Sequence, residues 1–139
     1  MSGIAFFDTN VLVYADDQES PEKQELAINL QLRYRPQNEM AVSLQVLQEY
    51  YNTLTRKLGI APEIVQRKVE LLGRARVVAF NVADIIASIE LHRLHRVSFW
   101  DAMILHAARV SRASILYTED LQHGSVIAGV SIVNPFLNS

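Results

Sequence analysis

Short apolar runs that alternate with longer helical segments constrain the fold of this chain more than any other feature. The runs at residues 4–7, 39–42, 77–80, 114–118 and 131–133 are short enough to be buried strands, and several are rich in β-forming side chains. Helical patterns lie between most of them. Because parallel strands need crossover helices that cover the faces of a sheet, the alternation favours an α/β fold. We therefore predict a three-layer α/β/α domain with a parallel sheet of four or five strands.

Helix start and stop signals place the connecting segments. One helix is predicted from Pro21 to about Tyr34. The next begins after Ser43, a favoured N-cap residue, and ends at Gly59. Its buried face is expected to consist of apolar residues at helical spacing, namely Leu44, Leu47, Tyr51, Leu54 and Leu58.

Three further helices are predicted in the second half of the chain. Pro62 stands in a favoured first-turn position and starts one of them. Another opens at Asn81 or Val82. The segment from Phe99 to about Val110 is apolar almost all round, so we expect it to be the central helix.

The composition limits the classes of function that the chain can have. With 139 residues, half of them apolar, residues 1–139 are expected to form a single domain. The absence of cysteine excludes disulfide scaffolds, thiolate zinc sites and cysteine nucleophiles, and it fits a cytoplasmic location. We see no signal peptide and no stretch apolar enough to span a membrane, so no membrane partner is expected. With a formal net charge of −2, any contact with nucleic acid must come from a local basic patch or from bound metal.

Acidic residues follow the ends of two predicted strands. Asp8 comes directly after the first strand, and Glu119 and Asp120 follow the fourth. In an open parallel sheet, ligands bind outside the carboxyl ends of the strands. Asp101, in the first turn of the predicted central helix, can point to the same edge. These acids from distant parts of the chain are therefore expected to meet.

Each of these acids also has a purely structural interpretation. Asp8 could cap the helix that follows it, since aspartate is a favoured N-cap residue. Asp101 lies three residues after Ser98, which resembles a capping box with Asp in place of Glu. Glu119 and Asp120 could be ordinary turn residues.

Glu49 is harder to explain as a structural residue. A surface Glu in a helix usually has a cationic neighbour three or four residues away. Here the residues at those positions are Gln45, Val46, Asn52 and Thr53, and none is cationic. A carboxylate on an apolar helix without a partner is costly, and a bound divalent cation would supply the missing partner.

A cluster of oxygen ligands without sulfur suits Mg²⁺, or Mn²⁺ as a substitute. Two such ions about 3.5–4 Å apart can activate a water and stabilise the leaving oxygen in phosphodiester hydrolysis. The histidines His92 and His95 have no other ligands nearby in sequence and are interpreted as surface residues. The basic residues are interpreted as a solvated face, or as the groups that hold an RNA backbone, namely Arg56, Lys57, Arg93 and Arg96.

Four segments resemble the motifs of the PIN-domain family, in family order and over nearly the whole chain. Residues 6–14 resemble its opening motif, 46–51 its second acidic motif and 98–102 its third. Residues 116–124, with the closing 133–136, resemble the last. The length and the single-domain form are similar to those of VapC-like toxin ribonucleases from bacterial and archaeal VapBC toxin–antitoxin pairs.

The resemblance implies a Mg²⁺- or Mn²⁺-dependent endoribonuclease that acts on an RNA substrate, forms a homodimer and is bound by a small cognate antitoxin. It maps Asp8, Glu49, Asp101 and Asp120 onto the metal-binding and catalytic acids of the family. Supporting polar positions are also implied, namely Thr9, Asn10 and Thr118. Glu119 is expected either to contribute to the metal shell or only to shape the turn.

Two alternatives remain open from the sequence. The first is a PIN fold without activity that serves as an interaction module, and the unpaired acids argue against it. The second is a DNA nuclease or a metal-dependent phosphatase on a similar scaffold, because an acidic pocket suits any phosphoester. The apolar helical segments 26–34 and 64–72 are expected to form a groove for an amphipathic peptide of the partner.

Overall fold

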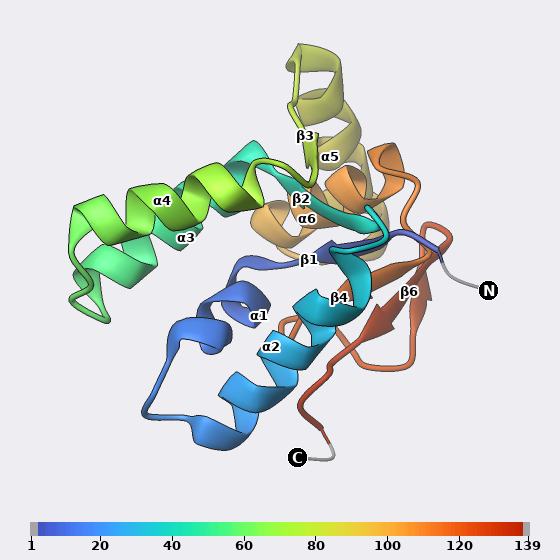
Figure 1. Cartoon of the computed structure of the whole chain (residues 1–139). Coiled ribbons are helices and arrows are strands. Elements are labelled where there is room, and N and C mark those ends of the chain that lie inside the picture. The colour runs from blue at the N-terminus through green and yellow to red at the C-terminus, as the bar shows by residue number, and fades with distance from the viewer. Residues whose placement is uncertain (1–2, 138–139) are drawn as a thin grey trace.

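A six-stranded sheet in the order β3-β2-β1-β4-β6-β5 forms the centre of the protein, which is described by a computed structural model over residues 3–137 (Figure 1). The strands are β1 (Ala5–Phe7), β2 (Met40–Ser43), β3 (Arg76–Val78), β4 (Ile115–Tyr117), β5 (Val126–Ile127) and β6 (Val130–Val133). All neighbouring pairs are parallel except β5 and β6. The predicted parallel sheet is therefore confirmed with five strands.

The sixth strand, β5, was not predicted. It has only two residues and pairs with β6 across a tight turn at Ala128 and Gly129, both of which have positive φ. That combination is typical of a two-residue hairpin turn whose twist matches the flanking strands. A strand of two residues has too few side chains to show an alternating pattern in the sequence.

The five helices from residue 21 onward occupy nearly the predicted bounds, whereas the two short helices before it were given none. The helices are α1 (Thr9–Val13), η1 (Tyr14–Asp16, a 3₁₀ helix), α2 (Pro21–Tyr34), α3 (Leu44–Arg56), α4 (Pro62–Leu72), α5 (Val82–His95) and α6 (Phe99–Val110). The Ser43 hydroxyl accepts a hydrogen bond from the amide of Val46 and so caps α3. Asn81 and Asp84 form a reciprocal capping box at the start of α5. None of the helices within residues 3–137 is long and apolar enough to cross a membrane.

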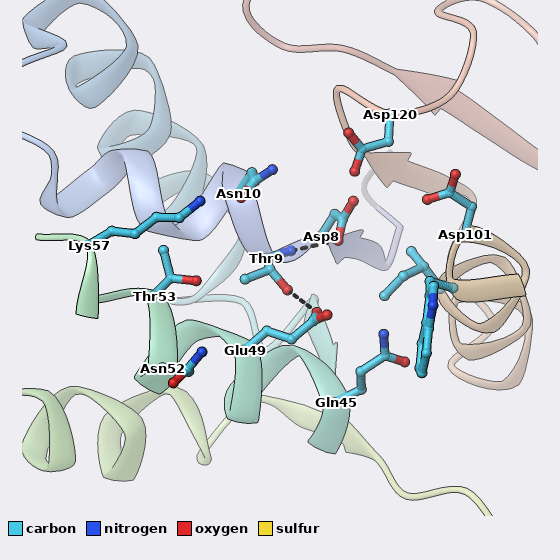
Figure 2. Close-up of a pocket in the computed structure, with 12 residues that line it drawn as sticks. Asp8, Thr9, Asn10, Gln45, Glu49, Asn52, Thr53, Lys57, Asp101 and Asp120 are labelled. Carbon is cyan, nitrogen blue, oxygen red and sulfur yellow. Dashed lines mark hydrogen bonds between the residues drawn. The ribbon is translucent and has the colours of Figure 1, made fainter. Parts of the chain in front are cut away.

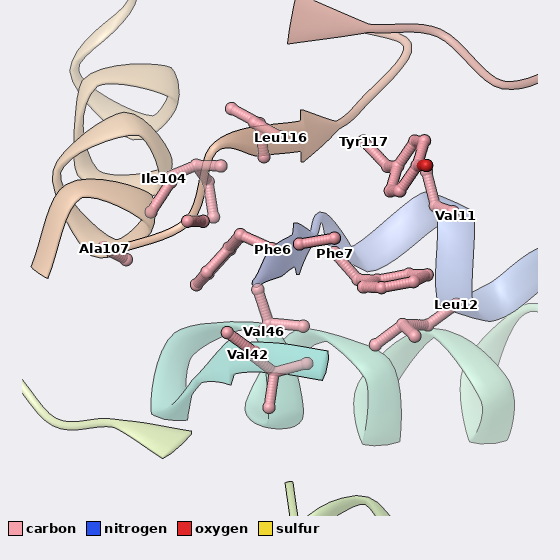
Figure 3. Packing of buried hydrophobic residues seen from close by; sticks show 14 of the residues in the cluster. Phe6, Phe7, Val11, Leu12, Val42, Val46, Ile104, Ala107, Leu116 and Tyr117 are labelled. Atoms are coloured by element: carbon pink, nitrogen blue, oxygen red, sulfur yellow. The ribbon is translucent and has the colours of Figure 1, made fainter. Parts of the chain in front are cut away.

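Helices cover both faces of β1, which is fully buried at the centre of the sheet. The ring of Phe7 packs against Tyr34 of α2 and Tyr117 of β4, with centroid distances of 5.8 and 5.3 Å. Because side chains alternate along a strand, Phe6 lies on the opposite face, where α6 crosses β1. Figure 3 shows α6 and α3 on opposite sides of this strand, with Ile104 and Val46 pointing into the core. The three-layer architecture is confirmed.

The buried face of α3 differs from the predicted one. Leu47 and Leu54 are buried as expected, but Leu44 and Tyr51 are 49% and 40% exposed. The helix instead buries an arc that includes Val46 and Tyr50. The rotation brings a row of polar residues on α3 toward the carboxyl ends of β1 and β4, where the candidate site lies.

Candidate active site

A pocket of about 380 Å³ lies at the carboxyl ends of β1 and β4, and all four acids singled out by the sequence line it: Asp8, Glu49, Asp101 and Asp120. Phe7 at the end of β1 is level with Tyr117 at the end of β4, so the residues that follow the two strands are adjacent. Figure 2 shows the carboxylates of Asp8, Asp101 and Asp120 directed into the same space, with Glu49 approaching from α3.

Asp8 is the buried member of the group, with 7% of its surface exposed. Its Oδ1 accepts a hydrogen bond from the amide of Thr9 at 2.7 Å, so it caps α1. Its Oδ2 accepts a hydrogen bond from the hydroxyl of Thr118 at 2.8 Å. Each carboxylate oxygen can accept a further contact. The capping role is therefore real, and it leaves Asp8 able to bind a cation.

The environment of Asp8 disfavours its negative charge. Burial raises the pKa of this carboxyl from 3.8 to about 6, and the charges of Asp120 and Glu49 push it in the same direction. The hydrogen bonds from Thr118 and Thr9 oppose the rise but do not cancel it. Such a perturbed group in a pocket is typical of a functional site.

Thr118 connects the two strand ends. Its hydroxyl donates to Asp8 and also accepts a hydrogen bond from the amide of Asp120 at 3.1 Å. The side chain is almost completely buried, so this pair of bonds holds the turn after β4 against the end of β1. The structure thus gives Thr118 a positioning role for both acids.

Glu49 lies on α3 and forms no salt bridge within the part of the chain that the structure describes. Its Oε1 accepts a hydrogen bond from the hydroxyl of Thr9 at 2.7 Å. Thr9 therefore links the first and second acids, since its amide binds Asp8 and its hydroxyl binds Glu49. The other side chains of α3 that line the pocket form a polar row at helical spacing, namely Gln45, Asn52, Thr53 and Lys57.

Asp101 lies in the first turn of α6, where its amide donates to the hydroxyl of Ser98 at 3.0 Å. Burial raises the pKa of its carboxyl, and the charge of Asp120 adds to the rise. The carboxylate is half-buried and faces the pocket rather than a cation. Its amide supports the helix start, which leaves the carboxylate available for a ligand.

The remaining residues that the sequence suggested fall into two groups. Asn10 and Lys57 line the pocket. Glu119 does not: it accepts a hydrogen bond from Lys23 at 2.9 Å in a salt bridge, so the structure places it in the turn rather than among the pocket acids. Three of the four basic residues are exposed outside the pocket, namely Arg56, Arg93 and Arg96.

The donor set of the pocket fits a hard divalent cation such as Mg²⁺ or Mn²⁺. Its ionisable acids are all carboxylates, and the chain has no cysteine. Burial raises the pKa values of Asp8 and Asp101, and the charges of neighbouring acids add to the rise. Within residues 3–137, no three His, Cys, Asp or Glu side chains stand close enough to form a ready-made metal cage. Glu49 and Asp120 are exposed, and only Glu49 is held by a side-chain hydrogen bond, from Thr9, so the carboxylate of Asp120 can adjust around an ion.

Sequence reasoning missed several residues of the pocket wall. Gln45, Asn52 and Thr53 were considered only as residues that are not cations, although their spacing around Glu49 is the signal of a polar helix face. Trp100 also lines the pocket and is 63% exposed. It lies in an apolar segment, and its exposure cannot be recognised from the sequence pattern.

Comparisons with known proteins point to one family. The sequence model of the PIN domain matches residues 5–126. No curated protein sequence matches the chain. Several solved structures are similar in fold, and the three described below cover most of this chain.

A toxin–antitoxin complex from Klebsiella pneumoniae superposes with a TM-score of 0.71 at 22% identity, over 95% of this chain and 98% of that chain. VapC20 of Mycobacterium tuberculosis, a sarcin–ricin loop cleaving toxin, gives 0.68 at 21% identity, over 84% and 89%. VapBC2 of Rickettsia felis, bound to a DNA fragment from its promoter, gives 0.64 at 21% identity, over 93% and 96%. At these identities the similarity shows a shared fold.

Proposed function

The chain belongs to the PIN domain family, and we propose that it is a metal-dependent endoribonuclease that hydrolyses RNA phosphodiester bonds as the toxin of a type II toxin–antitoxin pair. The observation that carries the proposal is the pocket lined by four acids from four segments of the chain, none of which forms a salt bridge within residues 3–137. PIN-domain nucleases generally use divalent metals, and the pocket's oxygen donors suit them.

In this mechanism Asp8, Glu49, Asp101 and Asp120 would hold Mg²⁺, for which Mn²⁺ could substitute. When bound, the metal supplies an activated water and stabilises the charge of the leaving oxygen. Thr9 and Thr118 fix the carboxylate of Asp8, because each donates a hydrogen bond to a different oxygen. Thr9 also orients Glu49. Pre-orientation by fixed donors lowers the cost of reaching the reactive arrangement.

We further propose that a small antitoxin binds in a groove between α2 and α4. The groove has a volume of about 280 Å³ and is lined by apolar residues that include Ile28, Leu32 and Leu71, together with Arg35 and with Lys68, which is paired with Asp16 of the same groove. An amphipathic helix with an acidic residue near Arg35, beside its apolar face, would complement this lining. The toxin–antitoxin complexes among the similar structures support a partner of this kind.

We also propose that the protein is a homodimer in the cytoplasm. Helix α5 exposes several apolar side chains, including those of Val82, Ile86 and Leu94. Exposed apolar side chains gathered on one helix are a candidate contact between two copies of a protein. Light scattering of the purified protein across a range of concentrations measures the oligomeric state, and a monomer at all concentrations would contradict the dimer.

A substrate panel tests the activity. The purified protein is incubated with RNA, single- and double-stranded DNA and small phosphoesters in Mg²⁺, in Mn²⁺ and in EDTA. We expect internal cleavage of RNA that EDTA abolishes. Cleavage of DNA or of small phosphoesters alone would instead indicate a DNA nuclease or a phosphatase, and no cleavage of any substrate would indicate an inactive interaction module.

Sequencing of RNA ends after induced expression then identifies the target. We expect discrete new 5′ ends in one class of RNA, together with arrested growth that co-expression of the antitoxin relieves. Free expression without new RNA ends would remove the main support for the toxin assignment.

A further inference from the structure

The acidic pocket has an exposed tryptophan in its wall. Trp100 is the only tryptophan of the chain, lies next to Asp101 in the first turn of α6 and is 63% exposed. Its ring touches that of Phe99 edge-on, at a centroid distance of 5.3 Å. Flat, exposed aromatic surfaces are where unpaired nucleic-acid bases stack.

The same pocket has one free lysine. Lys23 and Lys68 are each held in a salt bridge, to Glu119 at 2.9 Å and to Asp16 at 2.8 Å. Lys57 follows the last residue of α3 and lines the pocket, and its ammonium group has no ion-pair or hydrogen-bond partner within residues 3–137. Figure 2 shows Lys57 and Asp101 on opposite sides of the pocket, with Asp8 and Glu49 between them.

We propose that an RNA strand crosses the pocket with one base stacked on Trp100 and a phosphate bound by Lys57. The proposal rests on the ribonuclease function proposed above and names how the substrate is held. Lys57 is eight residues beyond Glu49, which is about 12 Å along the axis of α3. That is several times the ~3.4 Å rise per nucleotide of a stacked strand, so Lys57 contacts a phosphate away from the one at the acids.

The arrangement restricts the substrate by conformation rather than by sequence. A lysine recognises a phosphate whatever the base, and stacking on an indole tolerates every base. A base can reach Trp100 only after leaving its own stack, which favours single-stranded loops and ends over duplex. Asn52 and Thr53, which lie between Glu49 and Lys57 on α3, can add neutral hydrogen bonds to the backbone of the strand.

Because Trp100 is the sole tryptophan, its fluorescence reports base stacking directly. The wild-type protein is titrated with a mixed-sequence single-stranded RNA of about a dozen nucleotides, roughly the upper range of single-strand site sizes. Ca²⁺ replaces Mg²⁺, and the titration is repeated in EDTA and with a blunt RNA duplex. We expect the single strand to quench the fluorescence and the duplex to leave it unchanged.

Variants separate the two contacts, with binding of a labelled RNA measured by anisotropy. Trp100→Leu should weaken binding by about tenfold, and Trp100→Phe should retain most of the affinity because it keeps a stacking surface. Lys57→Gln should weaken binding by about fivefold at low salt and reduce the salt slope by about 0.7, the loss of one phosphate contact. Arg56→Gln, which removes the same charge one residue earlier and outside the pocket, is the matched control and should bind like the wild type.

The outcomes distinguish this inference from the proposed activity. If the wild type cleaves RNA while neither variant changes binding and no quenching occurs, the strand path is wrong and the nuclease assignment stands. If binding and quenching behave as expected but RNA is never cleaved, the strand path stands and the nuclease assignment fails. If the wild type binds no RNA, both fail. A fluorescence change that follows protein concentration instead of RNA would make Trp100 a contact between copies and overturn the inference.

Discussion

Carboxylates occur in two contrasting environments in this protein. Near the partner groove, Asp16 is paired with Lys68 at 2.8 Å and also accepts a hydrogen bond from the hydroxyl of Tyr50 at 2.7 Å. In the acidic pocket, Asp8 and Asp101 face other acids and form no salt bridge within residues 3–137, although Lys57 also lines the pocket. The first arrangement stabilises the fold, whereas the second places like charges together.

The pKa values show the same contrast. Asp84 of α5 accepts hydrogen bonds from the amide of Asn81 and from His106, and these contacts hold the pKa of its carboxyl below the ordinary value. Burial and neighbouring acids instead raise the pKa of Asp8 to about 6. Asp8 and Asp84 both bind backbone amides at a helix start, yet the ionised form is disfavoured in Asp8 and favoured in Asp84. The comparison shows that the acids of the pocket destabilise the metal-free folded state, and that a bound cation would offset their repulsion.

The largest expected effect comes from removing an unpaired acid. Asp101→Asn should reduce RNA cleavage by more than about a hundredfold, because a metal ligand contributes at least as much as the groups that orient it. The folded state should persist, since the amide of residue 101 still donates to Ser98. Cleavage of a labelled RNA, together with thermal unfolding, measures both properties.

Asp16→Asn is the matched control for that variant. It removes the same charge from a paired acid and should destabilise the protein by roughly 1–2 kcal/mol, because Lys68 loses its partner and Tyr50 a charged acceptor. Cleavage by the folded fraction should be unchanged. Equal losses of activity in the two variants would remove the distinction between the regions.

The stability of the metal-free protein should depend on pH through Asp8. Because its folded-state pKa lies near 6 and its ordinary value is 3.8, the folded state binds the proton more tightly than the unfolded state. The resulting stabilisation is fully present below about pH 4 and is lost as the pH rises through 6, by up to about 3 kcal/mol. Urea unfolding in EDTA at pH 5 and pH 7 checks this.

Asp8→Asn isolates that contribution from the other titrating groups. The difference in unfolding free energy between wild type and variant should shift in favour of the variant as the pH rises from 5 to 7. A difference that stays constant with pH would show that Asp8 titrates normally and that the pocket imposes no charge repulsion on it.

The smallest effect is expected at Glu119, beside the pocket. Glu119→Gln breaks the salt bridge to Lys23, whose ammonium keeps its hydrogen bond to Tyr14 and its position 4.5 Å from the centre of that ring. Because the pair is partly exposed, the loss should be about 0.5 kcal/mol, with little change in cleavage. A loss of activity comparable to that of Asp101→Asn would place Glu119 in the metal shell.

Much of the fold could be predicted because the signals that start and end its helices are local in the sequence. Pro21, Ser43, Pro62 and Asn81 each mark a helix start through their own backbone or capping chemistry, and the structure confirms these starts within a residue. The short helix η1 and the strand β5 escaped prediction because two or three residues carry no periodicity. The prediction of the buried face of α3 was partly wrong, because the rotation of a helix about its axis depends on the elements that pack against it.

The candidate site was predictable in outline only. The position of acids after parallel strands and in a helix start follows from general rules of sheet topology. The bonds that connect them do not, because Thr9 reaches Glu49 across 40 residues and Thr118 reaches Asp8 across 110. The exposure of Trp100 likewise depends on tertiary packing, and an apolar helix pattern predicts the opposite.

The central claim is that the unpaired acids form a metal site, and calorimetric titration with Mn²⁺ tests it most directly. The wild type, Asp8→Asn and Asp16→Asn are titrated at pH 7 and their thermal unfolding is followed with and without the ion. We expect saturable binding and a raised melting temperature for the wild type and for Asp16→Asn, because a ligand that binds only the folded state stabilises it. For Asp8→Asn we expect greatly weakened binding and a metal-free melting temperature equal to or above that of the wild type. Equal Mn²⁺ affinity in wild type and Asp8→Asn, or no binding by the wild type at millimolar Mn²⁺ with or without RNA, would contradict the account.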